Sequence, residues 1–401
     1  MKYKTGLFIT AVIVTSMCLR GPIASVGSLI NPMESELMVS KGELGFITTL
    51  PIIVFAVSSL LIPKIANSIG HTRILIFGML ILSFGCYIRS VAGYAVILAG
   101  TLLVGIGISV GNVLISGIIK DNMPLKIGLA TGIYLCFQNL SATAAAGFSY
   151  PLSESFQWGW RNVLSFWAIP GVLAVLVWII FGFYNGRNPS KIPASLDQAE
   201  STDNNRNLWK SKLAWSITIM MGVQSVCYYV LTAWLPSMLG TADISFQTAG
   251  YMASMFQLFA LPSTFIAPII MDRTKYKIMP AVLSGVLYIA GILIIMYSYS
   301  IPVILIGLFL LASGGGASFA WIVAIIAMVT KDSHEATRLS GMAQSVGYLM
   351  SAVAPTLAGV LYDISGSWMP VTLIIIVMSI LIIISSTATG RILKTSQNAI
   401  N

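Results

Sequence analysis

The sequence contains very little charge for its length. Only 9% of its 401 residues are Asp, Glu, Lys or Arg, whereas 57% are hydrophobic. A soluble domain usually has about 25% charged residues, so this chain has too few to cover a surface that faces water. The composition excludes an ordinary soluble protein and predicts a polytopic membrane protein. The net charge of +9 does not indicate nucleic-acid binding, because the basic residues fall in short segments between apolar ones.

Residues for metal, disulfide and acid–base chemistry are also scarce. The four cysteines lie in apolar segments without CxxC spacing, and the two histidines lie in polar segments away from them. We therefore expect no disulfide, no metal site and no cofactor. The sequence shows no Ser-His-Asp set, no buried acid–base pair and no nucleotide-binding loop. This pattern argues against an enzyme and against ATP as the energy source.

Twelve apolar segments have the length of a membrane-spanning helix, which needs about 20 residues. The predicted fold class is therefore all-α, a polytopic membrane protein with twelve transmembrane helices. The polar segment 185–212 has the composition of a solvated linker and separates six spans from six. We expect an N-terminal six-helix bundle at 1–184 and a C-terminal six-helix bundle at 213–401. The predicted spans are 6–30, 43–66, 73–93, 95–119, 126–150, 163–184, 213–238, 246–270, 278–298, 302–328, 337–361 and 368–390.

The basic residues favour one side of the membrane. If the termini and the even-numbered loops share a side, that side holds 18 Lys and Arg residues and the other holds three. By the positive-inside rule, we expect a protein of the cytoplasmic membrane with both termini in the cytoplasm. The larger group is Lys2, Lys4, Lys64, Arg73, Lys120, Lys126, Arg187, Lys191, Arg206, Lys210, Lys212, Arg273, Lys275, Lys277, Lys331, Arg338, Arg391 and Lys394, and the smaller is Lys41, Arg89 and Arg161.

The two halves carry similar motifs at corresponding positions. A segment that begins Pro-x-Ile ends the second span at 63–67 and the eighth span at 268–272, and Lys-Asp follows both the fourth and the tenth spans. Such internal similarity favours two six-helix repeats around a central site, as in many transporters.

The loop after the second span resembles the signature of the major facilitator superfamily, Gly-x-x-x-Asp-Arg-x-Gly-Arg-[Arg/Lys]. Here Gly70 and a basic end remain, but Asn67-Ser68 replaces the Asp-Arg pair. The loop after the eighth span keeps Asp272-Arg273. The resemblance implies the major facilitator fold, alternating access and a monomer. We expect Asp272 and Arg273 to act in the conformational change.

Further segments resemble the cyanate and 2-nitroimidazole transporter family (CynX/NimT). They are Leu-Arg-Gly-Pro at 19–22, Gly-Asn-Val-Leu at 111–114, Tyr-Tyr with Ala-Trp-Leu-Pro within 228–236, and Leu-Ser-Gly-Met-Ala-Gln-Ser-Val-Gly-Tyr at 339–348. The last segment is the strongest match, and the resemblance extends from Arg20 to about Trp368. It implies transport of a small solute and leaves the substrate open.

Arg20 is a charged residue in the middle of the first span. All 13 acidic residues lie in loops or at span ends, so no carboxylate neighbours it in sequence. A guanidinium stays protonated, and placing it at mid-membrane is unfavourable by several kcal/mol or more. We predict that Arg20 faces a cavity and binds an anionic or strongly polar substrate. The alternative is a structural role, in which Arg20 pairs with carbonyls or polar side chains and holds helices together.

Other polar residues near the membrane midplane are candidates for the same site. A buried amide needs hydrogen-bond partners, so each one either contacts substrate or bonds another helix. Gln344 and Tyr348 share one helix face, whereas Tyr229 points about 100° away from Tyr228. The predicted substrate-binding residues are Arg20, Asn112, Gln138, Tyr228, Gln257, Gln344 and Tyr348.

Two residues toward the outer ends of spans have different expected roles. We expect Arg89, which ends the third span, to extend its charged group to the membrane interface. Trp234 is a candidate outer gate, with an interfacial anchor as the alternative.

The leading interpretation is a secondary active or facilitative transporter that moves a small anionic or polar solute by alternating access. Its partners would be that solute, the lipid bilayer and, in a symport mechanism, protons; a uniporter or exchanger stays open, and no nucleic acid is expected. The alternative is an exporter of drugs or toxic metabolites. Export of a cation is disfavoured because the spans lack an acidic group, whereas export of neutral or anionic compounds stays open.

Overall fold

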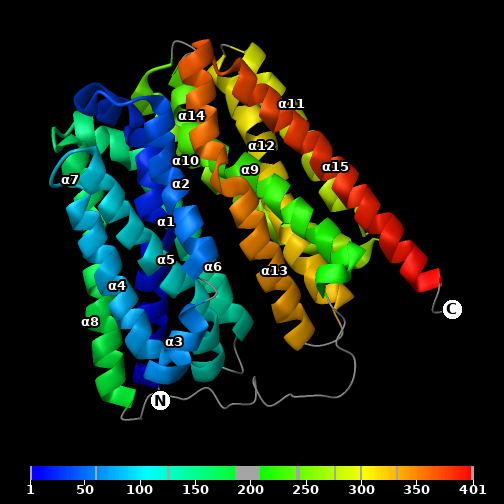
Figure 1. Ribbon diagram of the computed structural model, residues 1–401, viewed down its shortest axis with the longest axis horizontal. Coiled ribbons are helices and arrows are strands. Elements are labelled where there is room, and N and C mark those ends of the chain that lie inside the picture. The colour runs from blue at the N-terminus through cyan, green and yellow to red at the C-terminus, as the bar shows by residue number, and fades with distance from the viewer. Residues whose placement is uncertain are drawn as a thin grey trace. The chain divides into compact units, whose positions relative to one another are not determined.

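The regular structure of the chain is helical throughout the described residues (Figure 1). The computed structural model describes residues 2–58, 61–123, 127–185, 208–240, 244–274, 277–298, 300–330 and 333–398. Within these residues, eleven helical segments are long and apolar enough to cross a membrane. A further helix, α6 (Ile127–Glu154), has 28 residues, which also suffices for a span. The predicted all-α membrane fold is confirmed.

Contacts between residues divide the chain into two compact units. Unit 1 comprises residues 1–39 and 46–200, and unit 2 comprises residues 40–45 and 201–401. The helices at 1–200 are α1 (Lys2–Leu37), α2 (Lys41–Ser58), α3 (Ile62–Ile69), α4 (His71–Ile88), α5 (Tyr94–Asn122), α6, α7 (Gly159–Phe166) and α8 (Ala168–Asn185). Those at 201–401 are η3 (Leu208–Lys210), α9 (Lys212–Gly240), α10 (Phe246–Arg273), α11 (Met279–Tyr297), α12 (Ile301–Val329), α13 (Ser333–Ala352), α14 (Ala354–Ser365) and α15 (Met369–Asn398).

Several predicted spans differ from the observed helices. The first span was predicted at 6–30, but α1 continues to Leu37. The predicted spans 43–66, 163–184 and 337–361 each consist of two consecutive helices, namely α2 with α3, α7 with α8, and α13 with α14. The last break falls at Val353, two residues before Pro355, whose ring cannot continue the preceding helical hydrogen bonds. By contrast, α1 contains Pro22 and Pro32 without a break.

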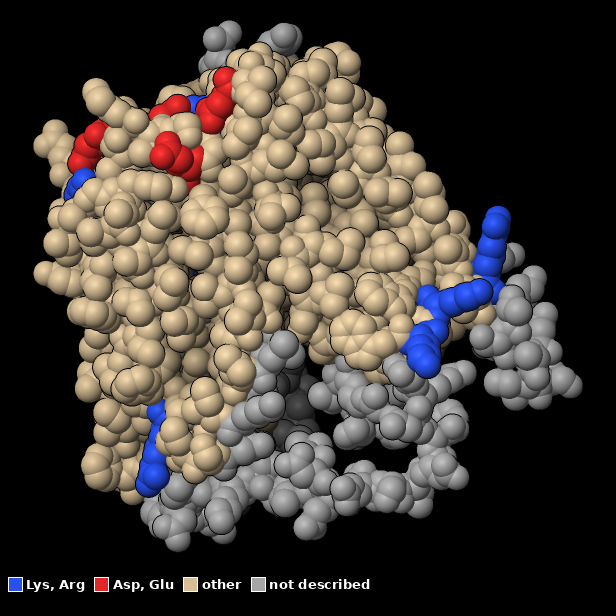
Figure 2. All heavy atoms as spheres, viewed as in Figure 1, with Lys and Arg blue, Asp and Glu red and all other residues tan. Residues whose placement is uncertain are grey.

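The surface of unit 1 is charged at its ends and apolar between them. On the face drawn in Figure 2, acidic side chains gather at the end near α7, and a basic side chain lies at the other end, near α3. Large apolar side chains stay exposed along the helices between, including Phe84 on α4 and Phe183 on α8. An exposed apolar band between charged ends is what a protein embedded in lipid requires.

The interior of unit 1 is built on close contact between helices. Phe8, Trp178 and Phe181 pack ring against ring between α1 and α8. The indole of Trp178 also donates a hydrogen bond of 2.8 Å to the Thr15 hydroxyl on α1, which satisfies a polar group inside the core. These contacts hold the α1 helix, which carries Arg20, within the bundle.

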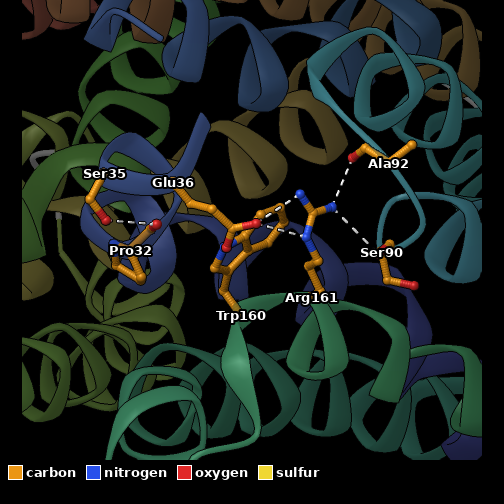
Figure 3. A network of polar contacts seen from close by, with 7 residues as sticks. All are labelled: Pro32, Ser35, Glu36, Ser90, Ala92, Trp160 and Arg161. Carbon is orange, nitrogen blue, oxygen red and sulfur yellow. Dashed lines mark hydrogen bonds and ion pairs between the residues drawn. The ribbon is translucent and has the colours of Figure 1, made fainter. Parts of the chain in front are cut away.

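A single carboxylate joins three segments at one end of unit 1 (Figure 3). Glu36, near the end of α1, accepts hydrogen bonds from the Trp160 indole at 2.6 Å and from Nε of Arg161 at 3.1 Å. Arg161 also lies over the Trp160 ring and donates to the carbonyl of Ala92 at 2.8 Å. The end of α1, the segment after α4 and the start of α7 are thereby fixed together.

In unit 2, a second carboxylate caps the start of α2. Asp363 on α14 accepts hydrogen bonds from the backbone N–H groups of Lys41, at 3.1 Å, and Gly42, at 2.8 Å. The first N–H groups of a helix have no partner within the helix, and its positive end attracts an anion. Gly359 lets the two backbones meet, because a Cβ at that position would collide with the Lys41 carbonyl. The first turn of α2 is therefore part of unit 2, although the helix continues into unit 1.

We expect Asp363→Asn to destabilise unit 2, because the amide keeps an acceptor oxygen but loses the charge at the helix end. A loss of about 1 kcal/mol should lower the thermal unfolding midpoint by about 2–4 °C. The measurement is thermal unfolding of the purified protein in detergent. Glu154→Gln is the control, because that carboxylate accepts its hydrogen bond from the neighbouring Ser153 hydroxyl and not from the N–H groups of a helix start. Equal midpoints for the two variants would contradict the capping role.

Candidate substrate site

Arg20 projects from the middle of α1 and reaches α6. Its Nη1 donates a hydrogen bond of 2.7 Å to Oδ1 of Asn139. Asn139 is neutral, so this bond orients the guanidinium without neutralising its charge. The acidic residues that follow on α1 begin at Glu34, ~21 Å further along the helix. The neutral Asn139 amide is therefore one partner that positions the Arg20 guanidinium, and Arg20 is only partly buried.

A second polar cluster lies beside this pair, on α5 and α6. Oδ1 of Asn112 accepts hydrogen bonds from the Tyr134 hydroxyl at 2.6 Å and from Nε2 of Gln138 at 3.1 Å. Gln138 directly precedes Asn139, so consecutive residues of α6 serve the two clusters. Among the predicted residues of unit 1, Asn112 and Gln138 are bonded to each other, and Arg20 bonds the neighbour of Gln138.

The hydrogen-bond pattern fixes how both asparagine amides point. An amide has one acceptor oxygen and one donor NH₂ group, so the network decides the orientation of each. In Asn112 and in Asn139 protein donors occupy the oxygen. The NH₂ groups point elsewhere, and together with the guanidinium they make this region rich in donors. Such a region suits an anion or a solute that carries acceptor oxygens.

Two members of this arrangement were not among the predicted substrate-binding residues. Tyr134 is 9% exposed and lies one helical turn before Gln138 on the same face of α6. That spacing of four residues was the available signal for Tyr134. Asn139 bonds a residue 119 positions away, and no local pattern identifies a partner so distant in sequence.

Two of the predicted residues of unit 2, Tyr228 and Tyr348, pack against the ring of Tyr229, on α9 and α13. The ring of Tyr229 lies edge-on to Tyr228 at 5.4 Å and to Tyr348 at 5.9 Å between centroids. The rings of Tyr228 and Tyr229 thus touch, although their backbone positions differ by about 100°. Gln344 donates to the Ser340 hydroxyl at 2.9 Å, one turn earlier on α13.

Gln257 on α10 is buried and donates to the Thr232 hydroxyl of α9 at 3.5 Å, which is a long hydrogen bond. Gln257 therefore links two helices, α10 and α9, which is one of the two roles expected for a buried amide. Among the described residues, Gln257 makes no hydrogen bond to Gln344 or to the tyrosines of α9 and α13.

Trp234 is fully buried, so the interpretation as an exposed interfacial anchor is wrong. Its indole donates a hydrogen bond of 2.8 Å to the carbonyl of Pro355, at the start of α14. Its ring packs 5.2 Å from Trp368, which in turn lies 4.4 Å from Tyr362. Trp234 therefore supports the break between α13 and α14.

The predicted pair Asp272 and Arg273 is described in part. Arg273 is exposed in the last turn of α10, where a cation is favourable because the helix end is negative. The side chain of Asp272 lies outside the described residues.

The expectation for Arg89 is also wrong. Its side chain is only 1% exposed and donates a hydrogen bond of 3.0 Å to the carbonyl of Pro22 on α1, so it turns into unit 1 rather than toward the interface.

The comparisons with known proteins agree on one family. The sequence model of the Major Facilitator Superfamily matches residues 12–300 and 241–394 of this chain. A protein of Bacillus subtilis (strain 168) described as uncharacterized transporter YycB is 36% identical over 377 residues, 93% of this chain and 91% of that protein. The 2-nitroimidazole transporter of Escherichia coli (strain K12) is 29% identical over 96% of this chain and 95% of its own length.

The cyanate transport protein CynX of Escherichia coli (strain K12) is 23% identical over 88% of each chain. These similarities cover nearly the whole length, and they confirm the resemblance first found in short segments such as 19–22 and 339–348. The chain therefore belongs to the Major Facilitator Superfamily, a family of transport proteins, and within it resembles the cyanate and 2-nitroimidazole transporters.

Proposed function

We propose that this protein moves a small anionic solute, or a polar solute rich in acceptor oxygens, across the cytoplasmic membrane by alternating access. Both termini would lie in the cytoplasm. The observation that carries the proposal is the donor-rich arrangement of Arg20, Asn112 and Asn139, in which both amide oxygens are already occupied. The names of the relatives support the same substrate class, because cyanate is an anion and a nitro group presents two acceptor oxygens.

The roles follow from the geometry of each side chain. Arg20 would supply the positive charge toward the solute, while Asn139 keeps its guanidinium in one orientation. Tyr134 and Gln138 would hold the Asn112 amide so that its NH₂ group faces the solute. Because these donors are positioned before the solute binds, less conformational entropy is lost on binding.

In unit 2, the candidates for binding are Tyr228, Gln344 and Tyr348, which are half-buried on α9 and α13. Their aromatic edges carry partial positive charge, and their hydroxyl and amide groups can donate to an anion. Gln257 would act by holding α10 to α9, and Trp234 with Asp272 and Arg273 would act in the conformational change.

The direction of transport and the coupling ion are separate questions. A donor-rich site binds an anion equally well for import and for export, so an exporter of anionic or neutral metabolites is the second candidate. Export of lipophilic cations fits the site poorly, because Arg20 would repel them. Uniport, exchange and symport with protons are all compatible with the site.

We expect Arg20→Gln to lower saturable anion uptake by about 10- to 100-fold in kcat/KM, the range expected for losing a charge-assisted hydrogen bond. Arg20→Lys should retain part of the activity, because it keeps the charge but loses the planar fork. The measurement is uptake into proteoliposomes of cyanate, nitrate, bicarbonate and short carboxylates, with 2-nitroimidazole and organic cations in the same panel.

Lys210→Gln is the control for the loss of one positive charge, since Lys210 is exposed on η3. Anion uptake that is unaffected by Arg20→Gln would make Arg20 structural and would favour the exporter of neutral compounds.

The variant Asn139→Asp tests the charge of the site while keeping its shape. The carboxylate would still accept the Arg20 hydrogen bond, but it would neutralise the guanidinium next to the proposed solute. Anion uptake should fall by about tenfold or more, whereas uptake of a neutral nitroimidazole should change less. Asn139→Leu serves as the comparison, because it removes the bond without adding charge. If Asn139→Asp transported anions as well as the unsubstituted protein does, the electrostatic part of the proposal would fail.

A further inference from the structure

Arg89 is a buried charge whose partners are all neutral. It follows the last residue of α4 and is 1% exposed. Its Nη1 donates to the Pro22 carbonyl at 3.0 Å, and its Nη2 lies 3.7 Å from the sulfur of Cys86. Its Nε has no hydrogen-bond partner among the described residues. Burying a guanidinium without a counter-charge is unfavourable for stability. We therefore ask what the buried Arg89 side chain holds in place.

The crossing of α4 and α5 is shaped to admit the Arg89 side chain. A Cβ placed on Gly100 of α5 would lie 2.8 Å from Cγ of Arg89. A larger residue at 100 would therefore push the arginine out of its place. With glycine there, the stem of Arg89 lies along the α5 backbone, and its guanidinium reaches α1 instead of the membrane interface.

The contact of Arg89 falls within the same tripeptide that carries Arg20. Arg20 bonds Asn139 of α6, and the carbonyl of Pro22 accepts the bond from Arg89. Between them, Gly21 lies directly against the indole of Trp167, where no Cβ would fit. Three consecutive residues are thus fixed by three different segments of unit 1.

This segment of α1 needs outside support because it contains a proline. Pro22 has no N–H, so the carbonyl four residues earlier loses its helical hydrogen bond, and the helix bends easily there. Residues 20 and 22 lie about 200° apart around the helix axis. Arg89 therefore holds α1 from the side roughly opposite to the one from which Arg20 extends.

We propose that Arg89 is a positioning residue for Arg20. Its hydrogen bond to the Pro22 carbonyl fixes the direction of the α1 backbone just after Arg20. This backbone position in turn keeps the Arg20 guanidinium within hydrogen-bond distance of Asn139. Arg89 does not touch the solute, because its side chain is buried behind α1. This inference rests on the proposed function, in which Arg20 binds the solute.

The test is a double-substitution cycle between Arg89 and Arg20 in proteoliposomes. With cyanate, or whichever anion of the panel above shows saturable uptake, Arg89→Met should raise KM about tenfold, which is ~1.4 kcal/mol. In the Arg20→Gln background, Arg89→Met should change KM by less than about twofold, because a residue that acts through Arg20 has nothing left to position. Arg89→Lys should largely restore KM, because its ammonium can still donate to the Pro22 carbonyl.

Arg161→Met is the matched control. Arg161 is another described arginine of unit 1, and it contacts residues 36, 90, 92 and 160. It should lower thermal stability without changing KM. An increase in KM from Arg89→Met that is equally large in the Arg20→Gln background would overturn the positioning role, and so would an unchanged KM in a folded Arg89→Met protein.

A structural readout separates this inference from the proposed function. A structure of Arg89→Met should show the distance between Arg20 Nη1 and Asn139 Oδ1 lengthened beyond hydrogen-bond range, whatever the transported solute. If the bond stays near 2.7 Å, the positioning role is wrong even if Arg20 binds anions. If the bond is lost but Arg20→Gln leaves anion uptake unchanged, the positioning stands and the proposed function fails. Should Arg89→Met not fold, Arg89→Gln enters the same cycle. An unchanged KM, or a rise in KM that is equally large in the Arg20→Gln background, overturns the proposal.

Discussion

The structure depends on keeping a guanidinium inside a membrane-spanning bundle without a carboxylate to balance it in sequence. Asn139 orients Arg20 through one short hydrogen bond, and this neutral amide adds no negative charge beside the guanidinium. An acidic residue in place of Asn139 would offset the guanidinium charge in apolar surroundings, and under the proposed function it would weaken the binding of an anion. The Asn112 amide is arranged in a similar way. Tyr134 and Gln138 donate to its oxygen, so the group that it can offer to a solute is its NH₂ donor.

Much of the fold could be predicted from composition and periodicity alone, because a bilayer allows few ways to satisfy a backbone. Long apolar segments have to be helices there, and the polar segment at 185–212 separates two sets of them. Helix ends were harder to predict. α1 runs on to Leu37, and its last turns carry polar residues such as Glu36, which bonds Trp160. The break at Val353 follows from Pro355, whose effect on a membrane helix depends on what its neighbours supply.

The site could be predicted in part. Arg20 was identifiable because a lone charge in an apolar segment is rare, but its partner Asn139 lies on another helix and depends on how α1 and α6 pack. The errors at Arg89 and Trp234 share a cause. Both lie toward span ends, where arginine and tryptophan usually meet the interface. Here Gly100 opens room for Arg89, and the Pro355 carbonyl offers a partner to the Trp234 indole. Such long-range complements have no local signature.

The network around Glu36 has a consequence for how this chain can vary. One carboxylate serves both the Trp160 indole and the Arg161 guanidinium, and Arg161 extends the network to the Ala92 carbonyl (Figure 3). Replacing Glu36 alone would orphan two donors at once, whereas replacing Arg161 alone would leave the indole bond intact. Relatives without a glutamate at the position of Glu36 should therefore also differ at the positions of Trp160 and Arg161. A substitution at the position of Arg161 alone should be tolerated. Glu36 should therefore vary less in evolution than Arg161, because two side chains depend on it for a hydrogen bond.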